Sequence, residues 1–193
     1  MQLVGGDTCR GPLSVTVQMH GLVNSGEALR RDTACPGDLI YVTGTLGDAA
    51  LALAIKKGEI AAPQKGYQYL LQRLDRPTPR INDGLGLHGV AHAMIDLSDG
   101  LVSDLGHILY ASRVGATVYV DRVPVSPVFE SCKKMIGAYD NAWIDMALSS
   151  GDDYELCFTM DPRHRPRLGE KLKDTPFTCV GEITMSSGMR CIM

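Results

Sequence analysis

The feature that most constrains the fold is an acidic turn, Asp96-Leu97-Ser98-Asp99-Gly100, here called the DLSDG turn. It joins an apolar segment to a stretch in which apolar residues recur at helical spacing, so it lies at a predicted helix N-terminus. Unpaired backbone N–H groups at such a terminus favour anions. Clustered carboxylates are also the oxygen ligands that Mg²⁺ takes. The turn is therefore suited to metal-bound phosphate.

Strand and helix patterns alternate along the whole chain. Strands are predicted over residues 13–23, 38–44, 116–121, 154–160 and 177–183, and helices over 49–55, 67–74, 82–93, 101–112, 142–148 and 163–173. No internal repeat or low-complexity linker interrupts them. This mixture predicts an α/β (α+β layered) fold.

Composition excludes several classes of function. The 193 residues are 45% hydrophobic, which is ample for a core, and carry a net charge of -3 with no long basic run. A nucleic-acid surface is therefore not expected. No 18-residue apolar stretch or signal-peptide pattern is present, so we expect a cytoplasmic protein without a membrane partner. The six cysteines form no Cys-x-x-Cys pair, which favours reduced structural thiols over disulfides or zinc ligands.

Two further acidic turns resemble the first in composition: Gly5-Gly6-Asp7-Thr8 (the GGDT turn) and Ser150-Gly151-Asp152-Asp153 (the SGDD turn). Carboxylates that meet in space repel one another unless a cation neutralises them, so a meeting of these turns would indicate a metal site. The alternative is local, with Ser98 or Asp99 capping the helix and Asp96 simply solvated. Spacing along the chain does not decide between the two.

Other candidate residues carry weaker signals. No Walker loop, Gly-x-Gly-x-x-Gly pattern or Ser/His/Asp arrangement is present. The glycines of residues 44–48 either bring backbone amides to a phosphate or serve the turn alone. His88 and His92 are spaced for zinc, but no third ligand is evident, so a surface or packing role is expected. Arg30 and Arg31 are either solvated or able to contact a nucleotide phosphate.

Taken in order, the motifs resemble those of the bacterial thiamine-monophosphate kinases. They are Gln2-Leu3-Val4 with the GGDT turn, Pro36-Gly37-Asp38, Val42-Thr43-Gly44, the DLSDG turn, and the SGDD turn continued by Tyr154-Glu155-Leu156. That family is similar to aminoimidazole ribonucleotide synthetase and selenophosphate synthetase, with an N-terminal α/β domain whose strands pair in a dimer and a C-terminal α/β domain. The resemblance implies a C-terminal fragment. Residues 1–32 would be the last strands of the N-terminal ATP-binding domain, and 33–193 a C-terminal domain of the aminoimidazole ribonucleotide synthetase-like fold, truncated at its end.

The resemblance also implies a role for each matching residue. Asp7, Asp96 and Asp99 would ligate Mg²⁺; Gly6, Asp7, Arg31 and Ser98 would contact ATP; and Asp152, where the family often has glutamate, would contact the thiamine substrate. The family's upstream Gly-Asp-Asp and Ser-Thr-Asp segments, which supply further ligands, do not occur ahead of Gly5.

The implied reaction is transfer of the γ-phosphoryl group of ATP to thiamine monophosphate, giving thiamine diphosphate, with several Mg²⁺ ions and a homodimeric parent protein. Because the acceptor phosphate is already an anionic nucleophile, no catalytic acid or base is assigned. Two alternatives stay open: another ATP-dependent synthetase or kinase of this superfamily, or a non-catalytic domain fragment.

Overall fold

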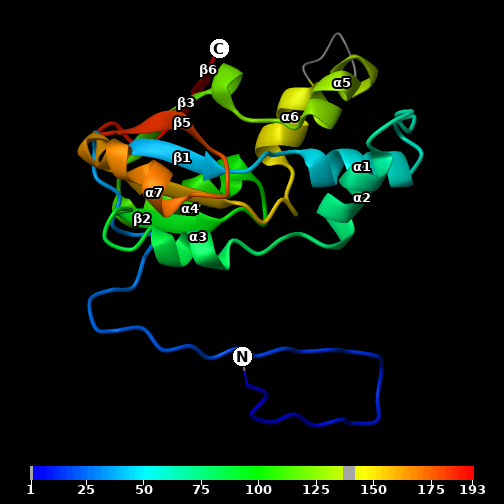
Figure 1. Cartoon of the computed structure of the whole chain (residues 1–193), viewed down its shortest axis with the longest axis horizontal. Coiled ribbons are helices and arrows are strands. Elements are labelled where there is room, and N and C mark those ends of the chain that lie inside the picture. Colours follow the sequence, from blue (N-terminus) through cyan, green and yellow to red (C-terminus); the bar gives the residue numbers. More distant parts are fainter. Residues whose placement is uncertain (1, 137–141) are drawn as a thin grey trace.

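The structure is a computed structural model that describes residues 2–136 and 142–193 (Figure 1). Its centre is a six-stranded sheet with the order β2-β4-β1-β5-β3-β6. The strands are β1 (Leu39–Thr43), β2 (Ala93–Asp96), β3 (Gly115–Tyr119), β4 (Leu156–Met160), β5 (Phe177–Thr184) and β6 (Gly188–Ile192). Neighbouring strands are antiparallel except β3 and β6, which are parallel.

Seven α-helices and two short 3₁₀ helices are present within the described residues. They are α1 (Asp48–Lys56), α2 (Tyr67–Asp75), α3 (Ile81–Gly86), α4 (Leu101–Ser112), α5 (Pro127–Ile136), α6 (Ala142–Ser149) and α7 (Leu168–Lys171), with η1 (Val120–Arg122) and η2 (Pro162–Arg167). None of the helices in the described part is long and apolar enough to cross a membrane.

The sheet buries both of its faces because its central strands alternate apolar side chains between them. Ile40 of β1 belongs to the apolar cluster that includes α4, whereas its neighbour Tyr41 stacks on Phe158 of β4 with ring centroids 5.4 Å apart. A third cluster joins α1, α2 and α5, which lie together at one end of the sheet in Figure 1. The predicted α/β layered fold is confirmed.

Most of the predicted elements are confirmed, and the exceptions have local causes. The helix predicted over 82–93 ends at Gly86, and Gly89 has a φ of 68°, which a continuing helix does not allow; β2 begins at Ala93. The helix predicted over 163–173 is instead a 3₁₀ turn followed by the four-residue α7, with Pro166 removing a backbone donor inside it. Three elements of the structure, β2, α5 and β6, were not predicted.

The strand predicted over residues 13–23 is wrong. Residues 2–28 are exposed and form no regular element, so the last strands of an N-terminal domain are not formed here. An isolated strand leaves its N–H and C=O groups unpaired, and no strand among the described residues runs beside this segment. The first sheet-like contact of the chain is a single bridge between Arg30 and Ala93. In Figure 1 the segment, drawn in blue, extends away from the folded body.

A fully buried carboxylate, that of Glu155, joins the strands to the helices at one end of the sheet. It accepts two hydrogen bonds of 2.7 Å from Arg80 and one of 2.7 Å from Thr43 Oγ1, and it lies 3.0 Å from Arg73. Gly44, with a φ of 59°, leaves the space for it, since a Cβ there would lie 2.2 Å from Glu155 Oε1. The carboxylate thus connects β1, β4, α2 and the start of α3.

We expect Glu155→Ala to lower the free energy of unfolding by about 3–5 kcal/mol, because it leaves the largely buried Arg80 without its carboxylate partner and removes one of the two carboxylates beside Arg73. Urea denaturation monitored by circular dichroism measures the change. The matched control is Asp75→Ala, which breaks the exposed pair with Lys56 and should cost less than about 1 kcal/mol. Equal losses in the two variants would contradict this role for Glu155.

Candidate functional site

The DLSDG and SGDD turns meet at one end of the sheet, because each extends one of the paired strands β2 and β4. The N–H of Asp152 donates to the carbonyl of Ser98 at 2.9 Å, and the N–H of Tyr154 donates to the carbonyl of Leu97 at 2.8 Å. The meeting that the sequence left open is therefore present for these two turns. It brings Asp152 beside the turn that carries Asp96 and Asp99, two of the three predicted metal ligands.

Two glycines permit this close approach. A Cβ at Gly151 would lie 2.0 Å from the carbonyl oxygen of Ser98, and a Cβ at Gly100 would lie 2.8 Å from the carbonyl carbon of Ser149. Gly100 also has a φ of 102°, which side chains rarely adopt. The glycine in each motif is therefore required for the two turns to approach this closely.

The carboxylates of Asp96 and Asp99 are exposed, and neither takes part in a hydrogen bond or ion pair within residues 2–136 and 142–193. The helix-capping interpretation is wrong, because α4 begins after Gly100 without a side-chain cap. The buried carboxylate of Asp104, one turn into the helix, instead accepts the N–H of Asp99 at 2.9 Å. Both exposed carboxylates are thus available to a cation.

The charges at this end of the sheet act on one another. The pKa of the Tyr154 hydroxyl is raised, chiefly by the negative charge of Asp152, with smaller contributions from burial and from Asp96 and Asp99. The pKa of Asp104 is raised mainly by its burial. A group of carboxylates within electrostatic range of one another is stabilised by a bound cation.

Arg31 lies near the start of β2, where its neighbour Arg30 bridges Ala93, whereas Asp96 is the last residue of that strand. Both line a cavity of about 680 Å³ beside β2, together with Met94. Arg30 pairs with Asp32 in solvent, which is the solvated alternative considered for the arginine pair. The predicted nucleotide contact of Arg31 is therefore compatible with its position.

The GGDT turn is not brought to this site. Asp7 lies in the exposed segment 2–28, and its carboxylate accepts bonds only from its neighbours among the described residues, Thr8 N–H at 2.7 Å and Cys9 Sγ at 3.6 Å. Gly6 is exposed in the same segment, with open space around it. No packing among residues 2–136 and 142–193 holds the turn near the DLSDG turn, so the roles predicted for Gly6 and Asp7 stay predictions.

Three arginines to which the sequence attached no individual role line a second cavity of about 290 Å³ with Glu155. Arg73 and Arg80 are bound to that carboxylate, whereas the exposed Arg76 forms no side-chain hydrogen bond in the part of the chain described. A guanidinium in this position can bind an anion through its N–H donors. The signal in the sequence was the Arg-Pro-Thr-Pro-Arg segment that follows α2.

The backbone amides of the two glycines in residues 44–48 bond within the fold. Gly44 N–H donates to the carbonyl of Pro176 at 2.8 Å, and Gly47 N–H donates to the carboxylate of Asp153 at 2.8 Å. The second bond places a buried acid at the N-terminus of α1. Burial raises the pKa of Asp153 to about 7, and its Oδ1 has no hydrogen-bond partner within the described residues.

This pKa predicts a pH-dependent stability. Because the folded value is about 7 and the ordinary value is 3.8, the folded state holds an extra proton between them. The free energy of unfolding should then fall as pH rises through that interval, by up to about 1.4 kcal/mol per pH unit. Asp153→Asn should remove this slope in urea denaturation, whereas Asp121→Asn, at an exposed carboxylate, should keep it. A slope unchanged in Asp153→Asn would refute the prediction.

The chain is similar to proteins of known activity. It is 48% identical over 187 residues to the thiamine-monophosphate kinase of Salmonella typhimurium and 44% over 190 residues to that of Haemophilus influenzae, in alignments that cover 95% and 96% of this chain. They cover 56% of each relative, so the chain spans about half the length of the curated relatives it matches.

Solved structures agree. The thiamine-monophosphate kinase of Stenotrophomonas maltophilia superimposes with a TM-score of 0.79 at 43% identity, over 88% of this chain and 54% of that one. AaThiL complexed with AMPPCP and TMP gives 0.70 at 31% identity, over 84% and 50%. Residues 35–193 match the family described as AIR synthase related protein, C-terminal domain. The layered fold and these similarities together show that the chain belongs to that family.

Proposed function

We propose that this chain is the C-terminal part of a thiamine-monophosphate kinase, which transfers the γ-phosphoryl group of ATP to thiamine monophosphate. One observation carries the proposal. In a chain 48% identical to a named thiamine-monophosphate kinase, two exposed and unbonded carboxylates, Asp96 and Asp99, stand on a turn locked against the SGDD turn. A solved relative named for its complex with AMPPCP and TMP supports the same substrates.

The residues fit Mg²⁺ in part. Asp96 and Asp99 offer only oxygen donors, which is the ligand type Mg²⁺ prefers, and their exposure leaves room for the waters that it retains. Asp7 would complete the set if segment 2–28 packed onto this end of the sheet. We assign Gly6, Asp7, Arg31 and Ser98 to ATP and Asp152 to the thiamine substrate.

These residues would act by bringing two polyanions together. Mg²⁺, when bound, supplies charge neutralisation at the phosphoryl oxygens during in-line transfer. Arg31, beside the same cavity as Asp96, would orient the nucleotide phosphates. No side chain is needed to remove a proton from the acceptor, since a phosphate oxygen is already an anion at neutral pH.

We infer further that the complete protein is a cytoplasmic homodimer and that a domain boundary lies between residues 32 and 33. The start of the family match at Cys35 supports this boundary. So does the exposure of Leu13, Val15 and Val17, whose alternating apolar pattern is typical of a strand that pairs with neighbours. Structures at 17–18% identity, such as Escherichia coli HypE, share the fold and leave the substrate undecided.

Binding of AMPPCP in the presence of Mg²⁺, measured by calorimetry, tests the roles of the carboxylates. We expect Asp96→Asn and Asp99→Asn each to weaken binding at least tenfold, about 1.4 kcal/mol, because each loses a cation ligand. Asp121→Asn is the control, since it removes an exposed carboxylate next to β3, four strands from β2. The assignment would be overturned if Asp96→Asn and Asp99→Asn weakened binding no more than Asp121→Asn does.

Formation of thiamine diphosphate from ATP and thiamine monophosphate tests the reaction itself. The assay should be run on this chain and on the product of the complete gene. Turnover by the complete product alone would make this chain a non-catalytic piece of the kinase. ATP consumption with other acceptors but not with thiamine monophosphate would favour a different synthetase or kinase of the same superfamily.

A further inference from the structure

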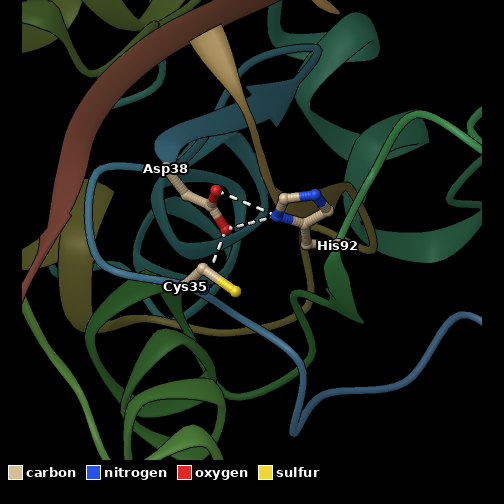
Figure 2. Close-up of side chains that lie close together, drawn as sticks. All are labelled: Cys35, Asp38 and His92. Atoms are coloured by element: carbon tan, nitrogen blue, oxygen red, sulfur yellow. Dashed lines mark hydrogen bonds and ion pairs between the residues drawn. The ribbon is translucent and has the colours of Figure 1, made fainter.

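A second group of metal-type ligands lies at the other end of the strands that carry the candidate active site. Cys35, Asp38 and His92 each offer one ligand atom, and these atoms all lie within 4.8 Å of one another. Figure 2 shows the three side chains close together, with dashed lines from the Asp38 carboxylate to the His92 ring and to Cys35, whose backbone N–H makes that bond. No other group of three such residues lies this close in the described parts of the chain.

The sheet topology explains the convergence. Both β1 and β2 pair with β4 in antiparallel orientation, so they are parallel to each other and begin at the same edge. Asp38 directly precedes β1, and His92 directly precedes β2. Cys35 opens the turn that leads into β1, in which the N–H of Asp38 donates to the carbonyl of Cys35 at 3.0 Å.

The strands separate this cluster from the candidate active site. Asp96 is the last residue of β2, whereas His92 precedes its first residue. Four residues of extended chain span about 13 Å. A ligand at the Cys35, Asp38 and His92 cluster therefore does not belong to the site formed by the DLSDG turn, and the two can be tested independently.

Neighbouring groups hold the ligands in place. The Oδ2 atom of Asp38 accepts from Cys35 N–H at 2.9 Å and from Thr159 Oγ1 at 3.2 Å. The backbone of His92 is fixed by bonds to Thr33 and Thr159, at 2.6 and 2.8 Å. Such outer bonds orient metal ligands in proteins. The Asp38 carboxylate is buried at this position, whereas the thiol-bearing Cys35 is exposed to solvent.

Oδ1 of Asp38 has one hydrogen-bond partner in the described residues, His92 Nδ1 at 2.9 Å, and the same Nδ1 lies 3.0 Å from Oδ2. A cation would take the place of these bonds, and the Cys35 thiol would exchange its contact with the Thr33 carbonyl, 3.7 Å away, for the cation. A zinc ion with ligands about 2.0–2.3 Å away needs them about 3.3–3.7 Å apart in tetrahedral geometry. The imidazole, which is half-exposed, has to move by about half an ångström to admit it, and solvent can supply the fourth ligand.

We propose that Cys35 Sγ, Asp38 Oδ1 and His92 Nδ1 form a site for a zinc-class divalent cation. A thiolate, an imidazole nitrogen and one carboxylate oxygen suit Zn²⁺, whereas Mg²⁺ and Ca²⁺ prefer oxygen ligands alone. On binding, the thiol releases its proton to solvent, and the imidazole carries its remaining proton on Nε2, so that Nδ1 is free to ligate. In this site the partners of His92 are Cys35 and Asp38, and His88 is not a ligand.

Zinc titration of the untagged, fully reduced chain, in excess Mg²⁺ to fill oxygen-only sites, tests the proposal. We expect one Zn²⁺ per chain, with at least tenfold weaker binding in Cys35→Ser and in His92→Gln. The matched controls are Cys191→Ser, at another exposed cysteine, and His164→Gln, at another histidine that is not fully exposed. Both controls should bind as the parent chain does.

Co²⁺ gives a second measurement that does not depend on affinity. A sulfur-to-cobalt charge-transfer band should appear in the parent chain and in Cys191→Ser and be absent from Cys35→Ser. Because the Cys35 side chain is exposed, we expect Cys35→Ser to fold as the parent chain does. Zinc affinity and cobalt spectrum unchanged in Cys35→Ser would overturn the proposal. So would the absence of Zn²⁺ binding by the parent chain, in which case the contact between Asp38 and His92 is a structural hydrogen bond.

Discussion

The fold depends above all on the burial of one carboxylate. Glu155 is fully buried and is satisfied by Thr43, Arg73 and Arg80, which come from a strand, a helix and the residue before another helix. Removing a charge from water is costly unless every partner is in place, so this contact requires β1, β4 and α2 to be correctly positioned at the same time. The buried carboxylate also constrains its surroundings. Position 44 has to be glycine to leave space for it, and the SGDD turn lies directly before it in the chain.

Sequence patterns predicted the parts of the fold in which local preference and tertiary packing agree. The helical spacing of 101–112 matches a face that the structure buries, and the alternation of 154–160 predicted a strand, β4, although that strand is buried on both faces. The prediction over 13–23 failed because alternation describes a face that needs a partner and says nothing of whether one is present. The helix predicted over 82–93 is too long. The prediction followed the helical spacing of the apolar residues and gave too little weight to the three glycines, which disfavour a helix.

The candidate site was predictable to the same degree. The glycine and aspartate residues of the DLSDG and SGDD turns identified both turns in the sequence, and backbone hydrogen bonds join the two turns in the structure. No individual role was predicted for the arginines of α2 and of the following segment, because a guanidinium is most often a solvated charge. Only tertiary contact reveals that Arg73 is buried against Glu155. The cluster of Cys35, Asp38 and His92 was missed for a similar reason: His92 is distant in sequence from the other two and meets them only because β1 and β2 both pair with β4.

The pairing of β1 with β4 has a consequence for how the chain chooses its native alignment. Buried polar contacts lie at both ends of this ladder, Asp38 with Thr159 at one and Thr43 with Glu155 at the other. If β4 slipped by one residue, every side chain would change face and both polar pairs would be broken within the core. Apolar residues alone would tolerate several alignments. The polar contacts at the two ends of the ladder therefore make the native register of β1 and β4 far more stable than registers shifted by one residue.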